Sequence, residues 1–119
     1  MDILSRIPPS REYFFDEGCH ILELSNTPDD PTVSIARARV EPGVTTRLHR
    51  LVETTERYVI LEGEGIVYIG DADPLPVERG DVIRIPAGAS QCITNSGSGD
   101  LVFLVICNPR FVPSCYQAL

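Results

Sequence analysis

The sequence has no lysine and no tryptophan, and all ten of its basic residues are arginine. Without lysine, the chain cannot use a Schiff-base lysine or the lysine of a phosphate-binding P-loop. The basic residues are outnumbered by seventeen acidic ones, which gives a formal net charge of −7. Proteins that bind nucleic acids by neutralising phosphates need a basic face, so we expect no nucleic-acid partner.

Long apolar runs are absent as well, so no segment is predicted to cross a membrane as a helix. The first residues, MDILSRIPP, lack the basic segment and apolar core of a secretory signal peptide. We therefore expect a cytoplasmic protein without a membrane partner. A chain of 119 residues suits one domain and is long enough to bury a proper core.

Residues that often carry catalysis or bind metals are few. Only two histidines occur, His20 and His49, and no serine lies in a G-x-S-x-G motif, so a hydrolase triad is not expected. His20 is far from the motifs described below, and we interpret it as an ordinary strand residue. The cysteines form no C-x-x-C pair, which argues against a zinc site or a disulfide framework and favours buried free thiols at Cys19, Cys92, Cys107 and Cys115.

Short strand-like segments, separated by glycine, proline and aspartate, fill most of the chain. They span residues 19–24, 32–40, 57–61, 65–69, 81–85, 91–94 and 101–107. Many short strands at this spacing are typical of an antiparallel sandwich or barrel, so we predict an all-β fold. After the second segment, the sequence Glu41-Pro42-Gly43 suits a type II turn, in which the glycine takes a positive φ.

Two stretches of the chain carry glycines, prolines and polar residues at a recurring spacing. The first runs from Gly43 to Gly63 and the second from Gly80 to Asn95. They resemble the paired motifs of the cupin superfamily, G-x5-H-x-H-x4-E-x6-G and G-x5-P-x-G-x2-H-x3-N. The matching positions are Gly43, His49, Glu56, Gly63, Gly80, Pro86, Gly88 and Asn95, whereas Leu51 and Gln91 stand where the pattern has histidine.

The resemblance implies a double-stranded β-helix, or jelly-roll, barrel in a single cupin domain over residues 1–119. We expect its barrel core at about residues 19–107, with an N-terminal arm at 1–18 and a C-terminal tail at 108–119. The arm carries the apolar run Tyr13-Phe14-Phe15, which needs a cover, and such barrels often pair through their sheets. We therefore predict a homodimer, with an arm folded over its own barrel as the alternative.

The four metal positions of the family map to His49, Leu51, Glu56 and Gln91, of which three can coordinate an ion. Imidazole nitrogen, carboxylate oxygen and amide oxygen are ligands for Mn, Fe, Ni or Zn, but the amide is a weak, uncharged donor. We expect a divalent metal, if bound, to be held weakly by His49, Glu56 and Gln91. The alternative is a polar cluster inside the barrel in which these side chains satisfy one another by hydrogen bonds.

Strand alternation predicts which side chains face the barrel interior. It places Thr45, Arg47, His49 and Leu51 on one face, and Glu56, Tyr58 and Ile60 on one face of the next strand. The candidate ligand-binding residues are then Arg47, His49, Tyr58 and Gln91. Arg47 is suited to a carboxylate or phosphate, or alternatively to a surface ion pair with Glu53 or Glu56. Tyr58 is either a cavity-lining residue or a core aromatic.

Because one fold hosts many activities, the resemblance leaves the reaction open. The best-supported function is a small-molecule-binding cupin whose barrel holds a small organic acid, a sugar or a similar metabolite. The alternative is a metal-dependent oxygenase or isomerase that uses His49, Glu56 and Gln91. A third hypothesis is a structural subunit that only pairs with others.

Overall fold

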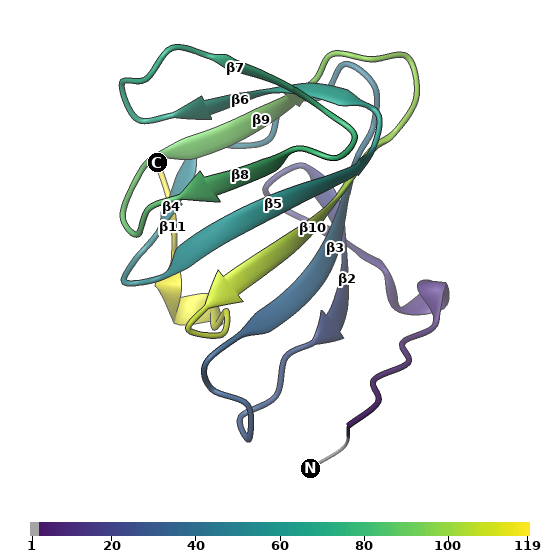
Figure 1. Ribbon diagram of the computed structural model, residues 1–119, viewed down its shortest axis with the longest axis vertical. Coiled ribbons are helices and arrows are strands. Elements are labelled where there is room, and N and C mark those ends of the chain that lie inside the picture. Colours follow the sequence, from purple (N-terminus) through teal and green to yellow (C-terminus); the bar gives the residue numbers. More distant parts are fainter. Residues whose placement is uncertain (1–2) are drawn as a thin grey trace.

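The computed structural model describes residues 3–119, which form two antiparallel sheets arranged as a barrel (Figure 1). In spatial order, the six-stranded sheet contains β1 (Tyr13–Phe15), β2 (Cys19–Ser25), β3 (Ser34–Val40), β10 (Leu101–Asn108), β5 (Thr55–Glu62) and β8 (Val82–Ile85). The five-stranded sheet contains β11 (Tyr116–Ala118), β4 (His49–Leu51), β9 (Gln91–Asn95), β6 (Glu64–Ile69) and β7 (Leu75–Glu78). The predicted all-β fold is confirmed.

Two short 3-10 helices complete the secondary structure of residues 3–119. They are η1 (Pro9–Arg11), before the first strand, and η2 (Pro113–Cys115), before the last one. In this part of the chain, no helix is long and apolar enough to cross a membrane.

Each of the seven predicted strand segments contains a strand, and β4 covers only the last three residues of the strand expected from Thr45 to Leu51. Strands β1, β7 and β11 were not predicted. Of these, β1 and β11 have only three residues each, too few to show alternation in the sequence. Their positions follow from pairing, since β1 lies against β2 and β11 lies against β4. Both sheets therefore extend beyond residues 19–107.

The hydrophobic core lies between the sheets and takes residues from β2, β3 and β5 through β10. Ile60, Ile93, Leu101 and Phe103 are each at most 2% exposed. Phe103 packs against Tyr58 with ring centroids 4.5 Å apart. Burial of one such side chain contributes roughly 1.5–3 kcal/mol, so these contacts hold the two sheets together.

Local expectations about turns and thiols agree with the structure. Gly43 has a φ of 78°, and the Val44 amide donates to the Glu41 carbonyl oxygen at 3.2 Å, as a type II turn requires. All four cysteines are free; three are buried, and Cys92 is partly exposed.

The N-terminal arm packs against its own barrel. Glu12 forms ion pairs with Arg39 at 2.7 Å and with Arg37 at 3.5 Å, and β1 extends the sheet beside β2. Phe14 remains 61% exposed, with its ring edge against His20 at a centroid distance of 5.1 Å. The folded-back arm considered above as an alternative is thus present within one chain.

Candidate functional site

A cavity opens between the two sheets, with a volume of about 680 Å³ that includes the part open to solvent. It exists because β3 presents small inward side chains, Ser34, Ala36 and Ala38, opposite the bulky residues of its neighbours. Aromatic side chains supply much of its lining. We call Tyr13, Phe15, Tyr58, Phe103, Phe111 and Tyr116 the aromatic wall.

His49 lies at one side of the cavity and is held by two acceptors. Its Nε2 is 2.8 Å from Glu17 Oε1, and its Nδ1 is 2.8 Å from the carbonyl oxygen of Arg47. A carbonyl oxygen can only accept, so Nδ1 carries a proton. Burial opposes the charged form of His49, but the hydrogen bond and charge of Glu17 outweigh it and raise the pKa above 6.5. The geometry therefore favours an imidazolium paired with Glu17.

Glu56 and Gln91 form a second, separate polar group with Tyr58. Gln91 Nε2 donates to Glu56 Oε1 at 2.6 Å, and the Tyr58 hydroxyl donates to Gln91 Oε1 at 2.6 Å. The thiol of Cys107 donates to Glu56 Oε2 at 3.9 Å. Burial raises the pKa of Glu56 to about 7, against the lowering effect of the Gln91 hydrogen bond. This carboxyl can therefore hold or release a proton near neutral pH.

The three expected metal ligands lie close together, as the motifs predicted. His49 is directly opposite Gln91 in the β4–β9 pair, and both are at most 2% exposed, while Glu56 is 6% exposed. Their donor atoms already have protein partners, however. Nε2 of His49 is paired with Glu17, and the side-chain amide of Gln91 is hydrogen-bonded to Tyr58 through its oxygen and to Glu56 through its nitrogen. Among residues 3–119, no group of three or more histidine, cysteine, aspartate or glutamate side chains is arranged to hold a metal.

A fourth ligand is missing because Leu51, 2% exposed, packs with Cys107 and Cys115 in an apolar cluster. The residues present therefore do not fit a metal ion. Of the expected polar cluster, Glu56 and Gln91 are hydrogen-bonded to each other, but His49 is bonded to Glu17 and to the Arg47 carbonyl instead.

Arg47 differs from the expected inward position. Strand β4 begins only at His49, and the irregular backbone before it places Thr46 inside and both Thr45 and Arg47 outside. The Arg47 amide donates to the Glu17 carbonyl oxygen at 2.7 Å, which fixes this course of the chain. Arg47 is exposed and does not line the cavity. The predicted alternation through Thr45 and Arg47 was wrong because it assumed regular strand geometry at those positions.

The charge of Arg47 still acts close to the cavity. Burial and the charge of Glu17 raise the pKa of Tyr116 to about 12, and the Arg47 guanidinium opposes that rise. Within residues 3–119, Arg47 forms no ion pair with Glu53 or Glu56. Its place is therefore outside the cavity but near Tyr116.

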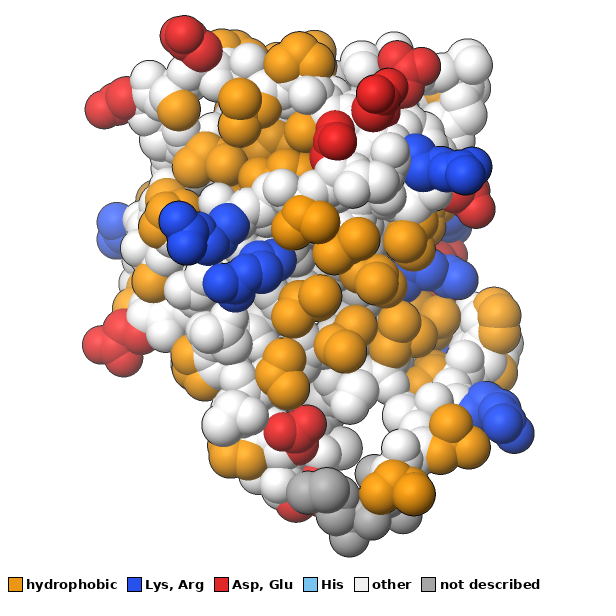
Figure 2. All heavy atoms as spheres, viewed as in Figure 1, with side chains coloured by type: hydrophobic (Ala, Val, Ile, Leu, Met, Phe, Trp, Pro, Cys, Tyr) orange, Lys and Arg blue, Asp and Glu red, His pale blue; other side chains and the backbone are white. Residues whose placement is uncertain are grey.

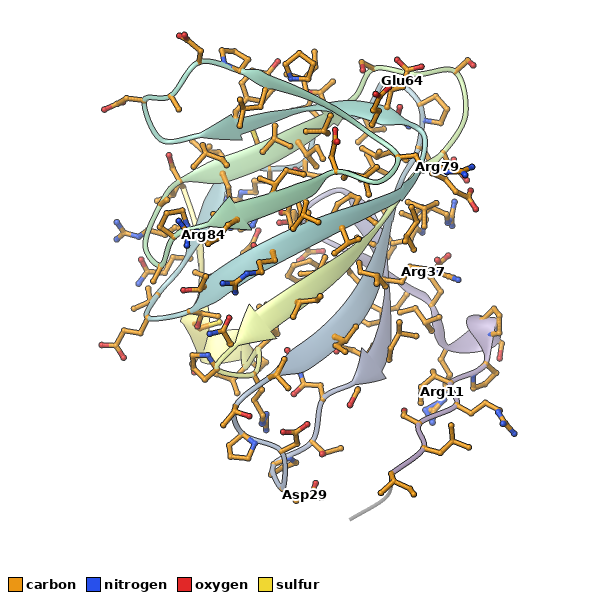
Figure 3. The ribbon with its side chains drawn as sticks, in the orientation of Figure 1. Arg11, Asp29, Arg37, Glu64, Arg79 and Arg84 are labelled. Carbon is orange, nitrogen blue, oxygen red and sulfur yellow. The ribbon has the colours of Figure 1, made fainter. Side chains whose placement is uncertain are left out.

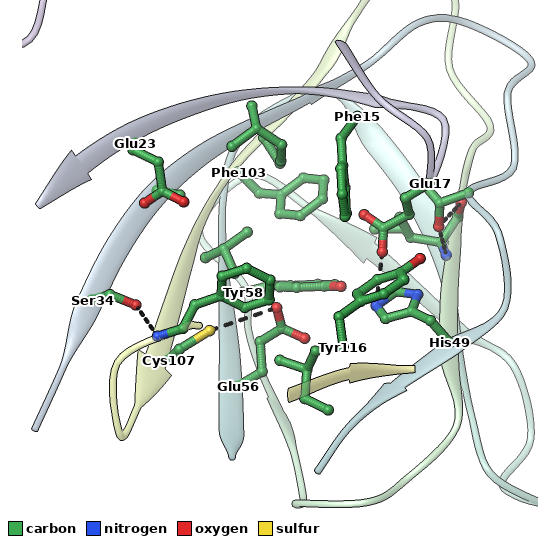
Figure 4. Close-up of a pocket in the computed structure, with 18 of the residues that line it drawn as sticks. Phe15, Glu17, Glu23, Ser34, His49, Glu56, Tyr58, Phe103, Cys107 and Tyr116 are labelled. Atoms are coloured by element: carbon green, nitrogen blue, oxygen red, sulfur yellow. Dashed lines mark hydrogen bonds and ion pairs between the residues drawn. The ribbon is translucent and has the colours of Figure 1, made fainter. Parts of the chain in front are cut away.

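Several cavity residues come from the arm and the tail and were missed from the sequence. The turn between β1 and β2 supplies Glu17, and β11 supplies Tyr116, whose ring stacks on His49 at 4.9 Å and 19°. Phe15 meets Tyr116 edge-on at 5.2 Å. Figure 4 shows this group at the His49 side of the cavity. The motifs do not include residues 1–18 or 108–119, so these contacts could not be predicted from the motif spacing.

The inward position of Glu23, in contrast, could have been predicted from the sequence. Alternation within β2 places Cys19, Ile21 and Glu23 on one face, and the last two line the cavity. An acidic residue at an inward strand position could have been selected as a site residue on that ground.

Comparisons with known proteins agree with this architecture. A family model described as a cupin domain matches residues 36–107. An oxalate-binding protein of Thermotoga maritima is 38% identical over 71 residues, which are 60% of this chain and 58% of that protein. An uncharacterized protein of Methanocaldococcus jannaschii is 33% identical over 103 residues, 85% of this chain and 82% of that protein. The matched segment thus spans little more than half of the Thermotoga relative.

Solved structures show the same fold. A predicted oxalate decarboxylase from Thermotoga maritima superposes with a TM-score of 0.79 at 24% identity, over 90% of this chain and 99% of that one. Streptomyces Pac13 with uridine, described as a nucleoside dehydratase, superposes with a TM-score of 0.81 at 16% identity, over 100% of this chain and 92% of that one. A protein with a double-stranded β-helix domain from Klebsiella pneumoniae superposes with a TM-score of 0.76 at 14% identity, over 92% of this chain and 90% of that one.

Because these solved structures are at most 24% identical to this chain, their likeness shows the fold alone. It confirms the double-stranded β-helix. The family model covers more than half of the chain, from β3 through β10. The chain therefore belongs to the cupin domain family.

Proposed function

We propose that the cavity binds a small hydroxylated metabolite of the sugar class, without the help of a metal ion. The observation that carries this proposal is the charge of the cavity: Glu17, Glu23 and Glu56 line it, and no arginine does. Carboxyl oxygens accept hydrogen bonds from hydroxyl groups. The aromatic wall offers apolar faces against which the carbon skeleton of a sugar can pack.

A small organic acid fits this cavity less well. The Thermotoga relative is named for oxalate, a dianion, and an anion needs a cation or several hydrogen-bond donors around it. Here His49 is already paired with Glu17, and Arg47 lies outside the cavity. A dicarboxylate would therefore meet like charge at short range, which disfavours binding.

Titration calorimetry against D-glucose, uridine, oxalate and succinate tests the proposal. We expect heat of binding from a neutral hydroxylated compound and none from either diacid. Tyr116→Ala removes part of the aromatic wall and should weaken that binding. Tyr68→Ala is the matched control, because Tyr68 is 36% exposed and does not line the cavity. Tighter binding of oxalate than of any neutral compound would contradict the proposal.

The alternative from the motifs is a metal-dependent oxygenase or isomerase. In its favour, His49 and Gln91 are buried opposite each other on β4 and β9, and Glu56, on β5 of the other sheet, meets Gln91 across the barrel. Against it, a metal would have to displace Glu17 from His49 and break the contact between Glu56 and Gln91. Metal analysis of protein purified without added metal separates the two functions, and stoichiometric Mn, Fe, Ni or Zn would favour the enzyme.

We also propose that two copies pair through the outer face of the six-stranded sheet. Figure 2 shows hydrophobic side chains gathered over this face. Outward positions of its strands hold Ile35, Val59, Val82, Val102, Leu104 and Ile106, and Val82 is 63% exposed. A continuous apolar strip on an exposed sheet is typical of a protein interface.

A further inference from the structure

Glu23 occupies an unusual position for a carboxylate. It lies on the inward face of β2, opposite Ala36 of β3, whose small side chain leaves room in the cavity. Figure 4 shows it pointing into the cavity on the side opposite the pair of Glu17 and His49, with Phe103 between them. Both sides of the cavity therefore carry an acidic group.

The three cavity carboxyls differ in their partners. Glu17 is paired with His49, and Glu56 accepts a hydrogen bond from Gln91. Glu23 forms no ion pair with any arginine or histidine of residues 3–119. Burial raises the pKa of Glu23, and the side chain of Asn26 acts in the opposite direction. Glu23 is partly buried and has no cationic partner, so a cationic ligand would offset the cost of its charge.

Apart from His49, which is already paired with Glu17, residues 3–119 supply no cationic side chain to the cavity. None of the arginines lines it, and Arg79 and Arg84 lie exposed at the surface (Figure 3). The cavity that Glu23 lines offers aromatic faces instead, and such faces attract cations. Tyr13 is paired with Ile21 in the β1–β2 register, two residues from Glu23, and both Tyr13 and Glu23 line the cavity.

We propose that the ligand is a small organic amine whose ammonium group pairs with Glu23 while its carbon skeleton packs against the aromatic wall. The ammonium donates charge-assisted hydrogen bonds to the carboxylate. The pair of Glu17 and His49 then meets hydroxyl groups at the other side of the cavity. This inference rests on the proposed function, since it specifies the charge of a ligand in the same cavity. An amino sugar has the required combination of groups.

A series of sugars that share one ring tests the charge requirement directly. Calorimetry at pH 7 compares D-glucosamine, D-glucose, N-acetylglucosamine and D-glucuronate. We expect glucosamine to bind about tenfold more tightly than glucose, because a hydrogen bond to a charged group contributes more than a neutral one. Glucuronate should bind most weakly. Equal affinity for glucosamine and glucose, or a preference for glucuronate, would overturn the inference while leaving a sugar site in place.

Glu23→Gln keeps the shape of the side chain and removes its charge. We expect this variant to lose the preference for glucosamine and to bind glucose as the natural protein does. Glu64→Gln is the matched control, because Glu64 is exposed and does not line the cavity (Figure 3). A preference that survives in Glu23→Gln would contradict the role of Glu23. The comparison within the natural protein stands even if the variant folds poorly.

A second series, benzylamine, benzyl alcohol and benzoate, separates the two proposals. If no sugar binds but benzylamine binds more tightly than benzyl alcohol, the sugar class is wrong and the amine preference holds. If neither series binds, both proposals fail. If the neutral members of both series bind as tightly as the amines, only the role of Glu23 is rejected.

Discussion

Glu17 and His49 form a buried ion pair in which Oε1 of the glutamate lies 2.8 Å from Nε2 of the histidine. The glutamate belongs to the turn between β1 and β2, and the histidine begins β4, so the pair joins the N-terminal segment to the opposite sheet. The Nδ1 contact with the Arg47 carbonyl fixes the ring from its other side. The motif histidine is thus occupied by a carboxylate of the same chain.

Replacing Glu17 should change the titration of His49. The folded protein has a raised His49 pKa, so its extra stability is present below about 6.5 and is lost as the pH rises through the folded pKa. In Glu17→Gln we expect that pKa to fall, because burial then acts without the opposing charge. An NMR titration of the imidazole signals measures it. An unchanged His49 pKa in the variant would contradict the pairing.

Glu56 should make the protein less stable at higher pH. Its pKa is about 7 in the folded protein and lower when unfolded, so stability falls as the pH rises from about 4.5 to about 7. Glu56→Gln removes the buried charge and keeps an acceptor for Gln91. We expect the variant to be more stable than the natural protein at pH 8, by at most about 3 kcal/mol, and nearly equal to it at pH 4.5.

Urea denaturation at both pH values gives the two differences, and Glu64→Gln serves as the exposed control. A loss of stability of equal size at pH 4.5 and pH 8 would mean that the hydrogen-bond geometry of Glu56, and not its charge, dominates.

Substitutions at Leu51 and Glu17 should together increase the affinity for metal ions. Leu51→His restores an imidazole at the family position, and we expect it to tighten the binding of Ni, Mn or Fe. Because Glu17 holds Nε2 of His49, the double variant Leu51→His with Glu17→Ala should bind Ni more tightly than Leu51→His alone. Titration calorimetry compares them. Negligible affinity in all of them would mean that His49 and Glu56 do not converge on a metal position.

The proposed dimer predicts a mass of about 26 kDa in solution, twice the 13.1 kDa of one chain. Val82→Arg adds charge to the apolar face beside Arg57 and Arg84, and we expect it to yield monomers. Leu75→Arg is the control, because Leu75 is 44% exposed and belongs to the other sheet. Light scattering at micromolar concentration decides between the states. A natural protein that is monomeric there would reject the dimer.

Local sequence features were enough to predict the fold and the inner polar group. Turn residues such as Gly43 mark where strands end, and the motif spacing places His49, Glu56 and Gln91 at buried positions inside the barrel. Period-two alternation within a regular strand then directs Glu56 and Tyr58 inward together. These inferences succeeded because each depends on residues close in sequence or on one repeated family pattern.

The partners of these residues were decided only by the tertiary structure. Glu17 and Tyr116 reach His49 through β1 and β11, each three residues long, whose pairing depends on distant segments. Arg47 turns outward because the backbone before β4 bonds to Glu17 and leaves regular strand geometry. The sequence therefore determined that His49, Glu56 and Gln91 lie inside the barrel. Folding of the two chain ends determined that His49 is held by a carboxylate, because hydrogen-bond partners are chosen by distance in space.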